Sequence, residues 1–563
     1  MATDILPPTT AGIRPEEFSE HLVFATSAKV ASITVLVLVA LAFCIRLGGL
    51  GIESLGEDEL NKLQTVEEYR LNGLSGKNGE HPFLMKGLQT LSIVAAEELN
   101  ADLLPAGSQI SDEAALRFPL VLFGSFTVLL IFLLVSELFG RSIGLVSSAL
   151  WAVEPMAIGF DRVAKEDSLV LFFFLLTNFF WIRSQTQAEL RNDRWRRYAW
   201  LTAASFAALM ASKYYPFFLA VTGAYYIIYR NVPNRFWDMK GVPWIKFLTI
   251  MAASFVVLNP TILLPETWRE MLRFSSENRI GHDSYEFMGQ LYRNQMSAFL
   301  NGVPWTFYFV FAAVKTSLST LILFFVGLVL IWRRKLGDGR FFIFLWGALW
   351  LITFTFIGGK FTRYFTNAAP LIFIGAAVGF FFMVKWLSKL SANKRLSAAA
   401  EILSFVGLLA VPLANSISAG PHFRLFTNSI GGGVAAAGTY FPHDEFYDLS
   451  TREIIVEIAK IARPNATIVC ETPELFEHYA QKAGRSDLVI VSLSNKNKVS
   501  GLVAGDFVVV AGGRRYQSNA AYLDLLSTSE QQPIYIKAGD AVSARIYPLE
   551  QTTVDAMRTI ATR

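Results

Sequence analysis

Six short clusters hold the residues best suited to chemistry, and each cluster lies at one end of a long apolar run. They contain Glu57, Asp58 and Glu59; Glu80, His81 and Lys86; Arg117; Asp161, Arg162, Lys165, Glu166 and Asp167; Lys213; and Lys360, Arg363 and Tyr364. A charged side chain in the middle of a bilayer costs at least ~2.5–3.5 kcal/mol, and all six clusters avoid that position. A lone charge at a span end is most often an anchor or simply solvated. Five charges within the seven residues 161–167 are better explained by a site.

The residue types in these clusters suit the handling of an anion. Lys213 and Arg363 are appropriate for binding a phosphate or diphosphate group. A nearby carboxylate could take a proton from the hydroxyl or amine of an acceptor. Glu80 and His81 could hold a divalent metal ion, or such groups could balance the cations. A lipid phosphate presented from the bilayer would arrive at this level. The chain contains no Walker pattern, and we expect no nucleotide site and no nucleic-acid partner.

The elements that must position these clusters are membrane spans. The chain has 563 residues, 53% of them apolar and 17% charged, whereas a soluble domain has about 45–50% and about 25%. Apolar runs of spanning length lie near 30–50, 115–136, 142–159, 168–183, 199–212, 215–229, 244–263, 305–332, 341–357, 365–386 and 398–419. We therefore predict a polytopic α-helical membrane protein with about 11 transmembrane helices.

The placement of Lys and Arg predicts the orientation of these spans. If the N-terminus is cytoplasmic, the basic loops near 183–197, 230–246, 333–340 and 385–395 all fall inside, as the positive-inside rule requires. The apolar part of 83–98 is too short to span and contains Lys86, so we expect a helix lying in the interface. We expect no cleaved signal peptide and no disulfide between Cys44 and Cys470.

The composition changes after about residue 420. TIVCE, LVIVSL and DFVVVAGG are typical of buried strands, and the segments between them are typical of helices. We predict a transmembrane part over 1–420, with outer loops at 51–113 and 263–303. We predict a small extracytoplasmic α/β domain over 421–563. The sequence leaves open whether this domain covers the site or recruits an acceptor.

The order of the polar motifs resembles that of the protein O-mannosyltransferases. An acidic pair after the first span is followed by HPFLMK, by RFP opening the second span, and by DRVAKEDSLVLFFF. SKYYP and RYFTNAAP resemble motifs of the bacterial relatives that transfer aminoarabinose to lipid A. These are GT-C glycosyltransferases, which use polyprenyl-phosphate-linked sugars. The resemblance covers roughly 30–390 and implies a GT-C fold with juxtamembrane helices in the first outer loop.

The resemblance also implies roles for individual residues. Asp58 would be the catalytic base or the partner that orients it, and the second acidic residue would be Asp167 or Glu166. The donor phosphate would be bound by basic and aromatic side chains, namely Lys213, Arg363, Tyr364, Arg117 and Lys86. Glu80, with His81, falls where the lipid A enzymes keep a carboxylate that binds metal or substrate. We expect Asp58 to face Lys213 and Arg363, and Glu57 and Glu59 to point elsewhere and be solvated.

The implied activity is that of an inverting glycosyltransferase in the bacterial inner (plasma) membrane. It would move a sugar from a polyprenyl-phosphate donor to a protein Ser/Thr, a lipid or a glycan at the outer face. The alternative is a transporter or flippase for a lipid-linked anion, which would use the same cations. Transporter sites tend to lie near the midplane between repeated halves, and here only Glu154 is charged near the middle of a run. A third, weaker interpretation is a non-catalytic assembly protein that works through its α/β domain.

Overall fold

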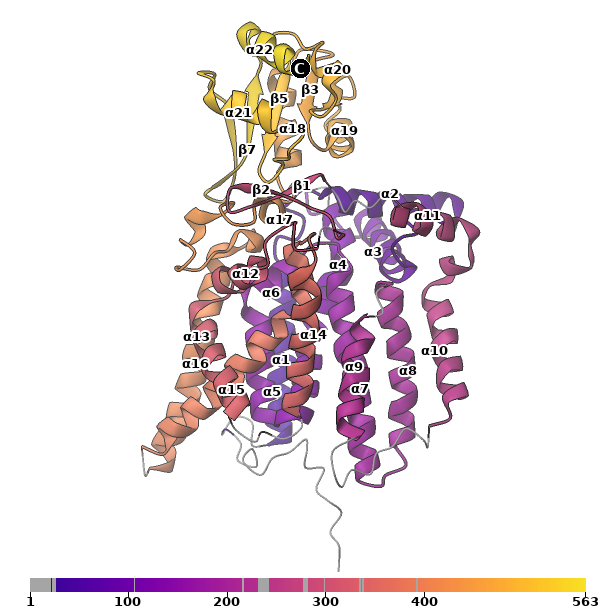
Figure 1. The fold of residues 1–563 in the computed structure, drawn as a ribbon, viewed down its shortest axis with the longest axis vertical. Helices are drawn as coiled ribbons and strands as arrows, with labels where there is room; N and C mark the ends of the chain where they lie inside the picture. Colours follow the sequence, from indigo (N-terminus) through magenta and orange to yellow (C-terminus); the bar gives the residue numbers. More distant parts are fainter. Residues whose placement is uncertain are drawn as a thin grey trace, which may run out of the picture.

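The molecule has a helical bundle at one end of its long axis and a small α/β domain at the other (Figure 1). The computed structural model describes residues 22, 27–105, 107–214, 217–230, 242–276, 282–297, 299–333, 336, 339–390 and 393–562. Juxtamembrane helices, two short strands and the segment after residue 420 lie between the two parts. The site residues discussed below come from this middle layer.

Helices of different lengths run side by side in the bundle (Figure 1). They are α1 (Ala28–Leu47), α4 (Asp112–Phe139), α5 (Arg141–Val153), α6 (Pro155–Asp161), α7 (Asp167–Glu189), α8 (Trp195–Ser212), α9 (Phe217–Arg230), α10 (Trp244–Leu258), α13 (Leu318–Arg333), α14 (Gly339–Phe356), α15 (Ala369–Ser388) and α16 (Lys394–Ala419). Leu150, Trp151 and Phe373 are fully buried where these helices pack together. The protein is an integral membrane protein.

The predicted count of 11 spans is not confirmed. Among the described residues, six helices are long and apolar enough to cross a membrane, or seven if α5 and α6 form one broken span bent by 66°. The bend lies at Glu154, directly before Pro155, because the residue before a proline is pushed out of the helical conformation. The predicted run 305–332 is likewise divided, into α12 (Phe307–Lys315) and α13. α10 and α13 are apolar but shorter than a full span.

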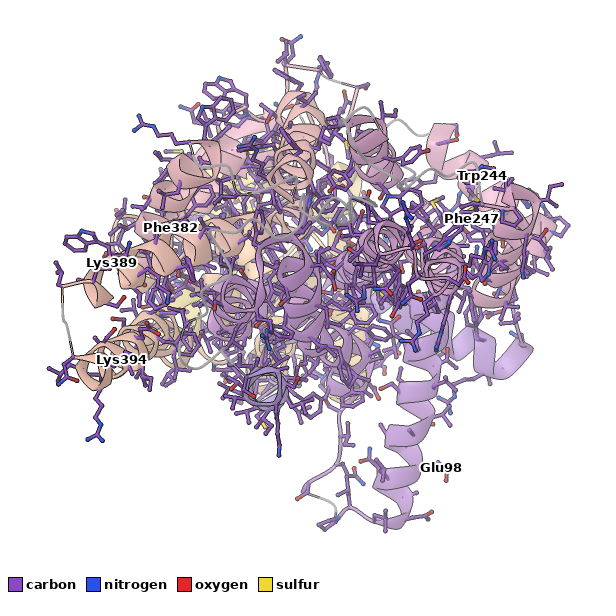
Figure 2. The ribbon with its side chains drawn as sticks, turned by 90° about the horizontal axis from the view of Figure 1, so that it is seen from below. Glu98, Trp244, Phe247, Phe382, Lys389 and Lys394 are labelled. Carbon is purple, nitrogen blue, oxygen red and sulfur yellow. The ribbon has the colours of Figure 1, made fainter. Side chains whose placement is uncertain are left out.

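The juxtamembrane helices lie at the end of the bundle that faces the α/β domain. They include α2 (Glu57–Asn72), α3 (Phe83–Asp102), η4 (Pro260–Leu263) and α11 (Pro265–Ser276). Seen from below the bundle, α3 extends sideways as far as Glu98 (Figure 2). This direction agrees with the predicted interfacial helix over 83–98. The short strands β1 (Ser284–Phe287) and β2 (Gln290–Arg293) and the turn η5 (Thr362–Asn367) complete this layer.

The α/β domain is built on a five-stranded sheet with the order β4-β3-β5-β7-β6. The predicted strands are β3 (Thr467–Cys470), β4 (Val489–Ser492) and β5 (Phe507–Ala511), which are parallel. Sequence analysis did not predict the antiparallel strands β6 (Ile534–Ala538) and β7 (Ala541–Pro548). The helices of the domain are α18 (Thr451–Ile461), α19 (Pro473–Lys482), α20 (Lys496–Val499), α21 (Ala520–Thr528) and α22 (Gln551–Ala561). Val469 and Val508 pack together in its core.

The segment between α16 and the α/β domain returns to the top of the bundle. It forms η6 (Phe423–Leu425), η7 (Val434–Ala436) and α17 (Pro442–Phe446). Lys315 at the end of α12 holds this segment, because its ammonium donates to the carbonyls of Arg424 and Phe426 at 3.1 and 2.6 Å. α17 therefore lies directly over the bundle, next to η5.

Candidate active site

A cavity of about 480 Å³ opens in the middle layer, at the level predicted for the site. Its walls come from the N-terminal half of α2, the loop before α3, the start of α7, the end of α8, η5 and the segment after α16. The polar and charged side chains that line it are Glu57, Asp58, Asn61, Lys62, Asn78, Glu80, His81, Lys165, Glu166, Lys213, Tyr214, His282, Ser284, Asn294, Arg363, Tyr364, His443, Tyr447 and Arg514. Seven of the ten predicted site residues are among them, and Asp167, Arg117 and Lys86 are not.

Asp58 lies in the first turn of α2 and lines the cavity. Its side chain is 42% exposed. The carboxylate forms an ion pair with Lys165 and accepts a hydrogen bond from the Tyr447 hydroxyl at 3.1 Å. Asn61 and Lys62 line the same cavity, as their spacing of three and four residues along the helix predicts. Burial lowers the pKa of Lys165 well below its usual value, and the charge of Arg363 lowers it further.

Glu59 does not have the solvated position expected from the sequence. It is fully buried, and its carboxylate pairs with the Arg117 guanidinium at 2.6 Å. It also accepts the backbone N–H groups of Gly56 and Ala164, at 2.8 and 2.7 Å. Glu57 is not simply solvated either, because it contacts Arg514 at 3.1 Å and His282 at 3.2 Å. Of the three acidic residues, Asp58 and Glu57 therefore both line the cavity, and Glu59 is withdrawn from it.

Arg117 and Lys86 do not lie where a donor phosphate could reach them. Beyond its contacts with Glu59, the Arg117 guanidinium donates to the carbonyls of Leu50, Glu53 and Ser54, at 3.2, 2.9 and 2.7 Å. Together these bonds use every N–H of the guanidinium. The Lys86 ammonium donates to three carbonyls of the preceding loop, the nearest at 2.7 Å. Both predicted phosphate ligands are therefore corrected to scaffold residues that hold the backbone around the site.

Glu80 and His81 line the cavity, but their neighbours do not complete a metal site. His81 Nδ1 lies 3.4 Å from Glu166, which also pairs with Lys62 at 3.1 Å. Burial lowers the pKa of His81 to about 3, so the ring is neutral. Glu80 accepts a hydrogen bond from Asn78 at 2.7 Å. Among the described residues, no three His, Cys, Asp or Glu side chains converge as metal ligands would. These residues do not fit a metal ion, and we derive no step through one.

The predicted phosphate-binding residues Lys213, Arg363 and Tyr364 come together around Asp167. Lys213 at the end of α8 lies 3.1 Å from the Asp167 carboxylate, and Arg363 in η5 lies 3.8 Å from it. The ring of Tyr364 packs against both cations, at 5.2 and 5.5 Å from its centroid. Asp167 therefore positions these cations, whereas Glu166 holds Lys62 and His81. The two candidates for the second acidic residue have different partners.

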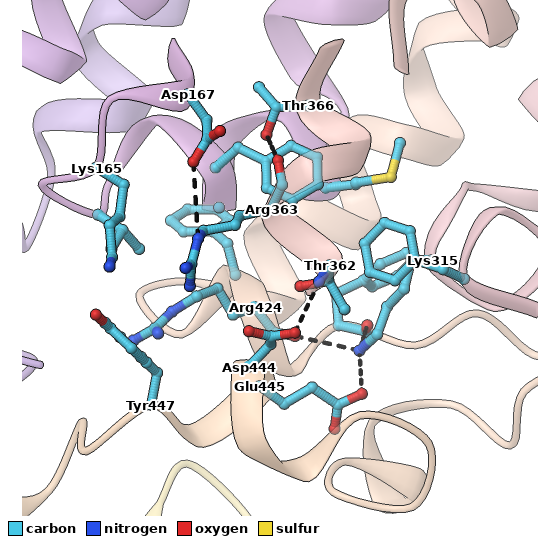
Figure 3. A pocket seen from close by; sticks show the side chains of 17 residues that line it. Lys165, Asp167, Lys315, Thr362, Arg363, Thr366, Arg424, Asp444, Glu445 and Tyr447 are labelled. Atoms are coloured by element: carbon cyan, nitrogen blue, oxygen red, sulfur yellow. Dashed lines mark hydrogen bonds and ion pairs between the residues drawn. The ribbon is translucent and has the colours of Figure 1, made fainter. Parts of the chain in front are cut away.

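A second, smaller pocket of about 70 Å³ is also lined by Arg363 (Figure 3). Lys165, Arg363 and Tyr447 line both pockets, so these three side chains form the partition between them. Asp444 of α17 accepts the backbone N–H of Thr362 at 2.7 Å and the Tyr285 hydroxyl at 2.6 Å. This anchors the backbone next to Arg363. Glu445 pairs with Lys315 at 2.8 Å.

The five charges at 161–167 are divided between two environments. Asp161 is buried and pairs with Arg46 at 2.8 Å, and Arg162 donates to the carbonyls at the end of α1. Lys165 and Glu166 line the large cavity, and Asp167 supports its cations. Only the C-terminal half of the cluster therefore belongs to the site.

Three residues after the last span line the cavity, and sequence analysis did not select them. They are His443, Tyr447 and Arg514. The run PHDEFYD at 442–448 is dense in polar residues and follows the bundle closely, which is a signal that could have selected the first two. Arg514 follows β5 and lies 457 positions from its partner Glu57. No pattern local to the sequence connects those two residues.

Comparison with known proteins identifies structures of similar architecture. A family model described as dolichyl-phosphate-mannose-protein mannosyltransferase matches residues 104–260. Apo ArnT from Cupriavidus metallidurans superposes with a TM-score of 0.50 and 13% identity, over 92% of this chain and 98% of that one. This protein has the GT-C glycosyltransferase fold. The family resemblance predicted from the sequence is confirmed at that level.

Other GT-C structures are similar to this chain at lower scores. ArnT bound to undecaprenyl phosphate gives a TM-score of 0.48 at 13% identity, over 91% of this chain and 97% of that one. The apo oligosaccharyltransferase of Archaeoglobus fulgidus gives 0.48 at 10% identity, over 85% and 69%. No curated protein sequence matches the chain. The matched segment 104–260 contains Lys165, Glu166, Asp167 and Lys213.

Within this GT-C fold, the cavity combines a carboxylate and fixed cations in one enclosed space. Asp58 is partly exposed and held by neighbours, which is the arrangement that a general base needs. Lys213 and Arg363 are oriented by Asp167 and by an aromatic ring, which suits recognition of a phosphate. The side chains of this cavity are therefore of the kinds that could bind a phosphate and accept a proton.

Proposed function

We propose that this protein is an inverting glycosyltransferase that uses a polyprenyl-phosphate sugar. The acceptor is a hydroxyl or amine on a protein, lipid or glycan. The observation that carries the proposal is that one cavity is lined by the Asp58 carboxylate and by the cations Lys213 and Arg363. A base and a phosphate site within one cavity are what transfer from a lipid phosphate requires.

The reaction assigns one task to each group. The acceptor oxygen or nitrogen forms a bond to the anomeric carbon, and the bond from that carbon to the phosphate oxygen breaks. Asp58 takes the proton of the acceptor. Lys213 and Arg363 stabilise the charge that develops on the departing polyprenyl phosphate. Asp167 keeps the two cations in position, since it contacts both.

An apolar cavity of about 870 Å³ supports a lipid-linked donor. It lies between α12, α13, α14 and α15 and is lined by Phe309, Phe324 and Leu351, among other apolar side chains. Phe365 and Ala368, at the end of η5, also line it. Since Arg363 lies in the same turn, a polyprenyl chain in this cavity would leave its phosphate near the cations. We assign the polyprenyl chain to it.

The same proposal sets the orientation in the membrane. The N-terminus is cytoplasmic, and the α/β domain and the site lie at the outer face of a bacterial inner membrane. The positive-inside pattern of the loops supports this direction. A transporter is less well supported, because the buried Glu154 is satisfied by the hydroxyls of Ser317 and Thr320, at 2.9 and 2.5 Å. The polar groups instead line the cavity of about 480 Å³ that contains Asp58, in the layer next to the α/β domain.

The test uses purified protein in nanodiscs and in sealed vesicles, with radiolabelled mannose and other sugars on undecaprenyl phosphate. An extract of bacterial membranes supplies acceptors. We expect label to move from the lipid to an acceptor, and this transfer to be lost in Asp58→Asn. The proposal is overturned if labelled lipid crosses the vesicle membrane but no sugar is transferred. It is also overturned if none of the donors tested gives either transfer or movement.

A further inference from the structure

Two neighbouring residues after α17 have a backbone conformation that is rare for residues other than glycine. Tyr447 has φ 38° and Asp448 has φ 59°. Such conformations are energetically unfavourable for residues other than glycine and persist where the surrounding structure holds them. Both side chains here are firmly held, and both point toward the first turn of α2. The conformation therefore indicates that this segment has a functional role.

Tyr447 is fixed against the cavity by contacts on several sides. Its hydroxyl donates to Oδ2 of Asp58 at 3.1 Å. A side chain at Gly56 would overlap the Tyr447 ring, so the glycine leaves the space that the ring fills. Lys165 and Arg424 lie over the ring, at 5.7 and 5.5 Å from its centroid. The phenol is thus held at one carboxylate oxygen of Asp58.

Asp448 connects this tyrosine to the α/β domain. Its carboxylate receives a bidentate contact from the Arg514 guanidinium, with Nε to Oδ1 at 2.8 Å and a second bond from Nη2. Asp448 also accepts the backbone N–H of Glu57 at 3.2 Å. Arg514 itself contacts the Glu57 carboxylate at 3.1 Å. Arg514, in the loop after β5, is therefore connected to the N-terminus of α2 through Asp448 and Glu57.

The turn before Arg514 allows the loop after β5 to lie close to α17. Gly513 has φ 78°, and a side chain there would overlap the backbone of Pro442 and His443. Tyr516 supports the guanidinium from the same loop, with its hydroxyl 3.0 Å from Nη1. The side chain of Arg514 is only 3% exposed. A buried cation with several charged partners is costly to leave unpaired, which fixes the position of the loop.

We propose that the C-terminal α/β domain completes the active site, with Arg514 holding Asp448 so that Tyr447 positions the carboxylate of Asp58. This inference rests on the glycosyltransferase function proposed above. Both Tyr447 and Lys165 contact Oδ2 of Asp58, which leaves Oδ1 to take the proton of the acceptor. Tyr447 is a positioning residue that acts through Asp58. The α/β domain is then part of the catalytic unit.

The first test compares Tyr447→Phe with the wild-type protein in the transfer assay. The substitution removes only the hydroxyl and keeps the ring beside Gly56. We expect kcat to fall about 10-fold to 100-fold, the effect of one hydrogen bond to a charged group, while KM for the lipid donor is unchanged. Arg514→Lys, which cannot make the bidentate contact, should lower kcat in the same way. Tyr535→Phe, at an exposed position of β6, is the matched control. An unchanged kcat in Tyr447→Phe overturns the proposal.

The second test measures the protonation of the Asp58 carboxylate directly and does not depend on sugar transfer. The carboxyl band of Asp58 is identified in infrared spectra as the band lost in Asp58→Asn, and it is titrated with pH. The phenol stabilises the ionised carboxylate, so in Tyr447→Phe the titration should move to higher pH. Lys165, Lys62 and Arg363 face the same cavity and are unchanged in the comparison. An unshifted titration overturns the positioning role. A shifted titration in a protein that transfers no sugar supports that role and overturns the proposed function instead.

Discussion

Asp58 and Glu59 are neighbours in the first turn of α2, but their carboxylates lie in different surroundings. The Asp58 side chain is 42% exposed to the cavity, and the Glu59 side chain is 1% exposed. Glu59 is enclosed by Arg117 and by two backbone N–H groups. Asp58 keeps one face toward the space where substrates would lie. A single helical turn therefore supplies both a scaffold residue and a candidate base.

The cations show the same division. Arg117 and Lys86 donate their N–H groups to backbone carbonyls and, in the case of Arg117, to Glu59. Lys213 and Arg363 contact a carboxylate and an aromatic ring and line the cavity. A charged residue of the site thus differs from a scaffold residue in two ways: its side chain lines the cavity, and its partners are side chains and not mainly backbone carbonyls. The number of charges in a sequence cluster does not separate them.

The largest expected effect is on the scaffold side of this comparison. Glu59→Gln removes the partner of a buried guanidinium, which typically costs 3–5 kcal/mol. We expect a clear fall in thermal unfolding temperature in detergent. Glu67→Gln, at an exposed position of the same helix, is the control and should leave that temperature unchanged. If Glu59→Gln unfolds like the wild type, the division between scaffold and site is wrong at this residue.

The next effect is on the donor phosphate. Lys213→Met and Arg363→Met each remove a charged hydrogen-bond donor, worth about 1.5–3 kcal/mol. We expect the Kd for undecaprenyl phosphate, measured by fluorescence with protein in nanodiscs, to rise roughly 10-fold to 100-fold. Lys246→Met, a surface lysine beside Trp200, provides the comparison. Unchanged affinity in both site variants would contradict the assignment of these cations.

A smaller effect should separate the two candidates for the second acidic residue. Asp167→Asn releases Lys213 and Arg363, so we expect weaker binding of undecaprenyl phosphate, by about tenfold. Glu166→Gln changes the contacts of Lys62 and His81 and should leave that binding unchanged. Isothermal calorimetry of both variants decides between them. The reverse order of effects would make Glu166 the residue that supports the phosphate site.

The smallest effect concerns the lipid chain. Gly347 lines the apolar cavity, and a side-chain carbon added at this glycine would lie 3.6 Å from Leu371. Gly347→Phe should fill part of the cavity and weaken long-chain polyprenyl phosphates several-fold, at about 0.8 kcal/mol for each CH₂ displaced. Farnesyl phosphate should bind as before. Gly407→Phe, on α16 where a side chain meets open space, is the control, and an equal loss for both chain lengths would argue against this cavity.

Much of the fold was predictable because its patterns are local. Apolar runs and the placement of Lys and Arg indicated a polytopic membrane protein, and short apolar segments such as TIVC indicated β3 and its neighbours. The exact number of spans was not predictable, because a bend such as that at Glu154 depends on how the helices pack. β7 escaped notice because its buried residues fall in adjacent pairs, Ser543 with Ala544 and Ile546 with Tyr547, which hides the alternation typical of a half-buried strand. β6 does alternate, but over only five residues.

The candidate site was predictable only in its polar core. Sequence order and residue type were enough to select Asp58, Lys213 and Arg363, which line one cavity. They could not show that Arg117 is enclosed by carbonyls, since those carbonyls belong to the turn before α2. They also could not select Tyr447 or Arg514, which reach α2 from the far end of the chain. Such contacts are set by tertiary structure alone.

The central claim is that Asp58 acts in the chemical step on a donor held by the cations. The most direct measurement is single-turnover transfer by Asp58→Asn with the lipid-linked sugar already bound. We predict that the affinity for undecaprenyl phosphate stays at the wild-type value, while the rate of transfer falls by ~10²–10⁴-fold, as expected for loss of a general base. A variant that binds the donor and transfers sugar at the wild-type rate would contradict the account.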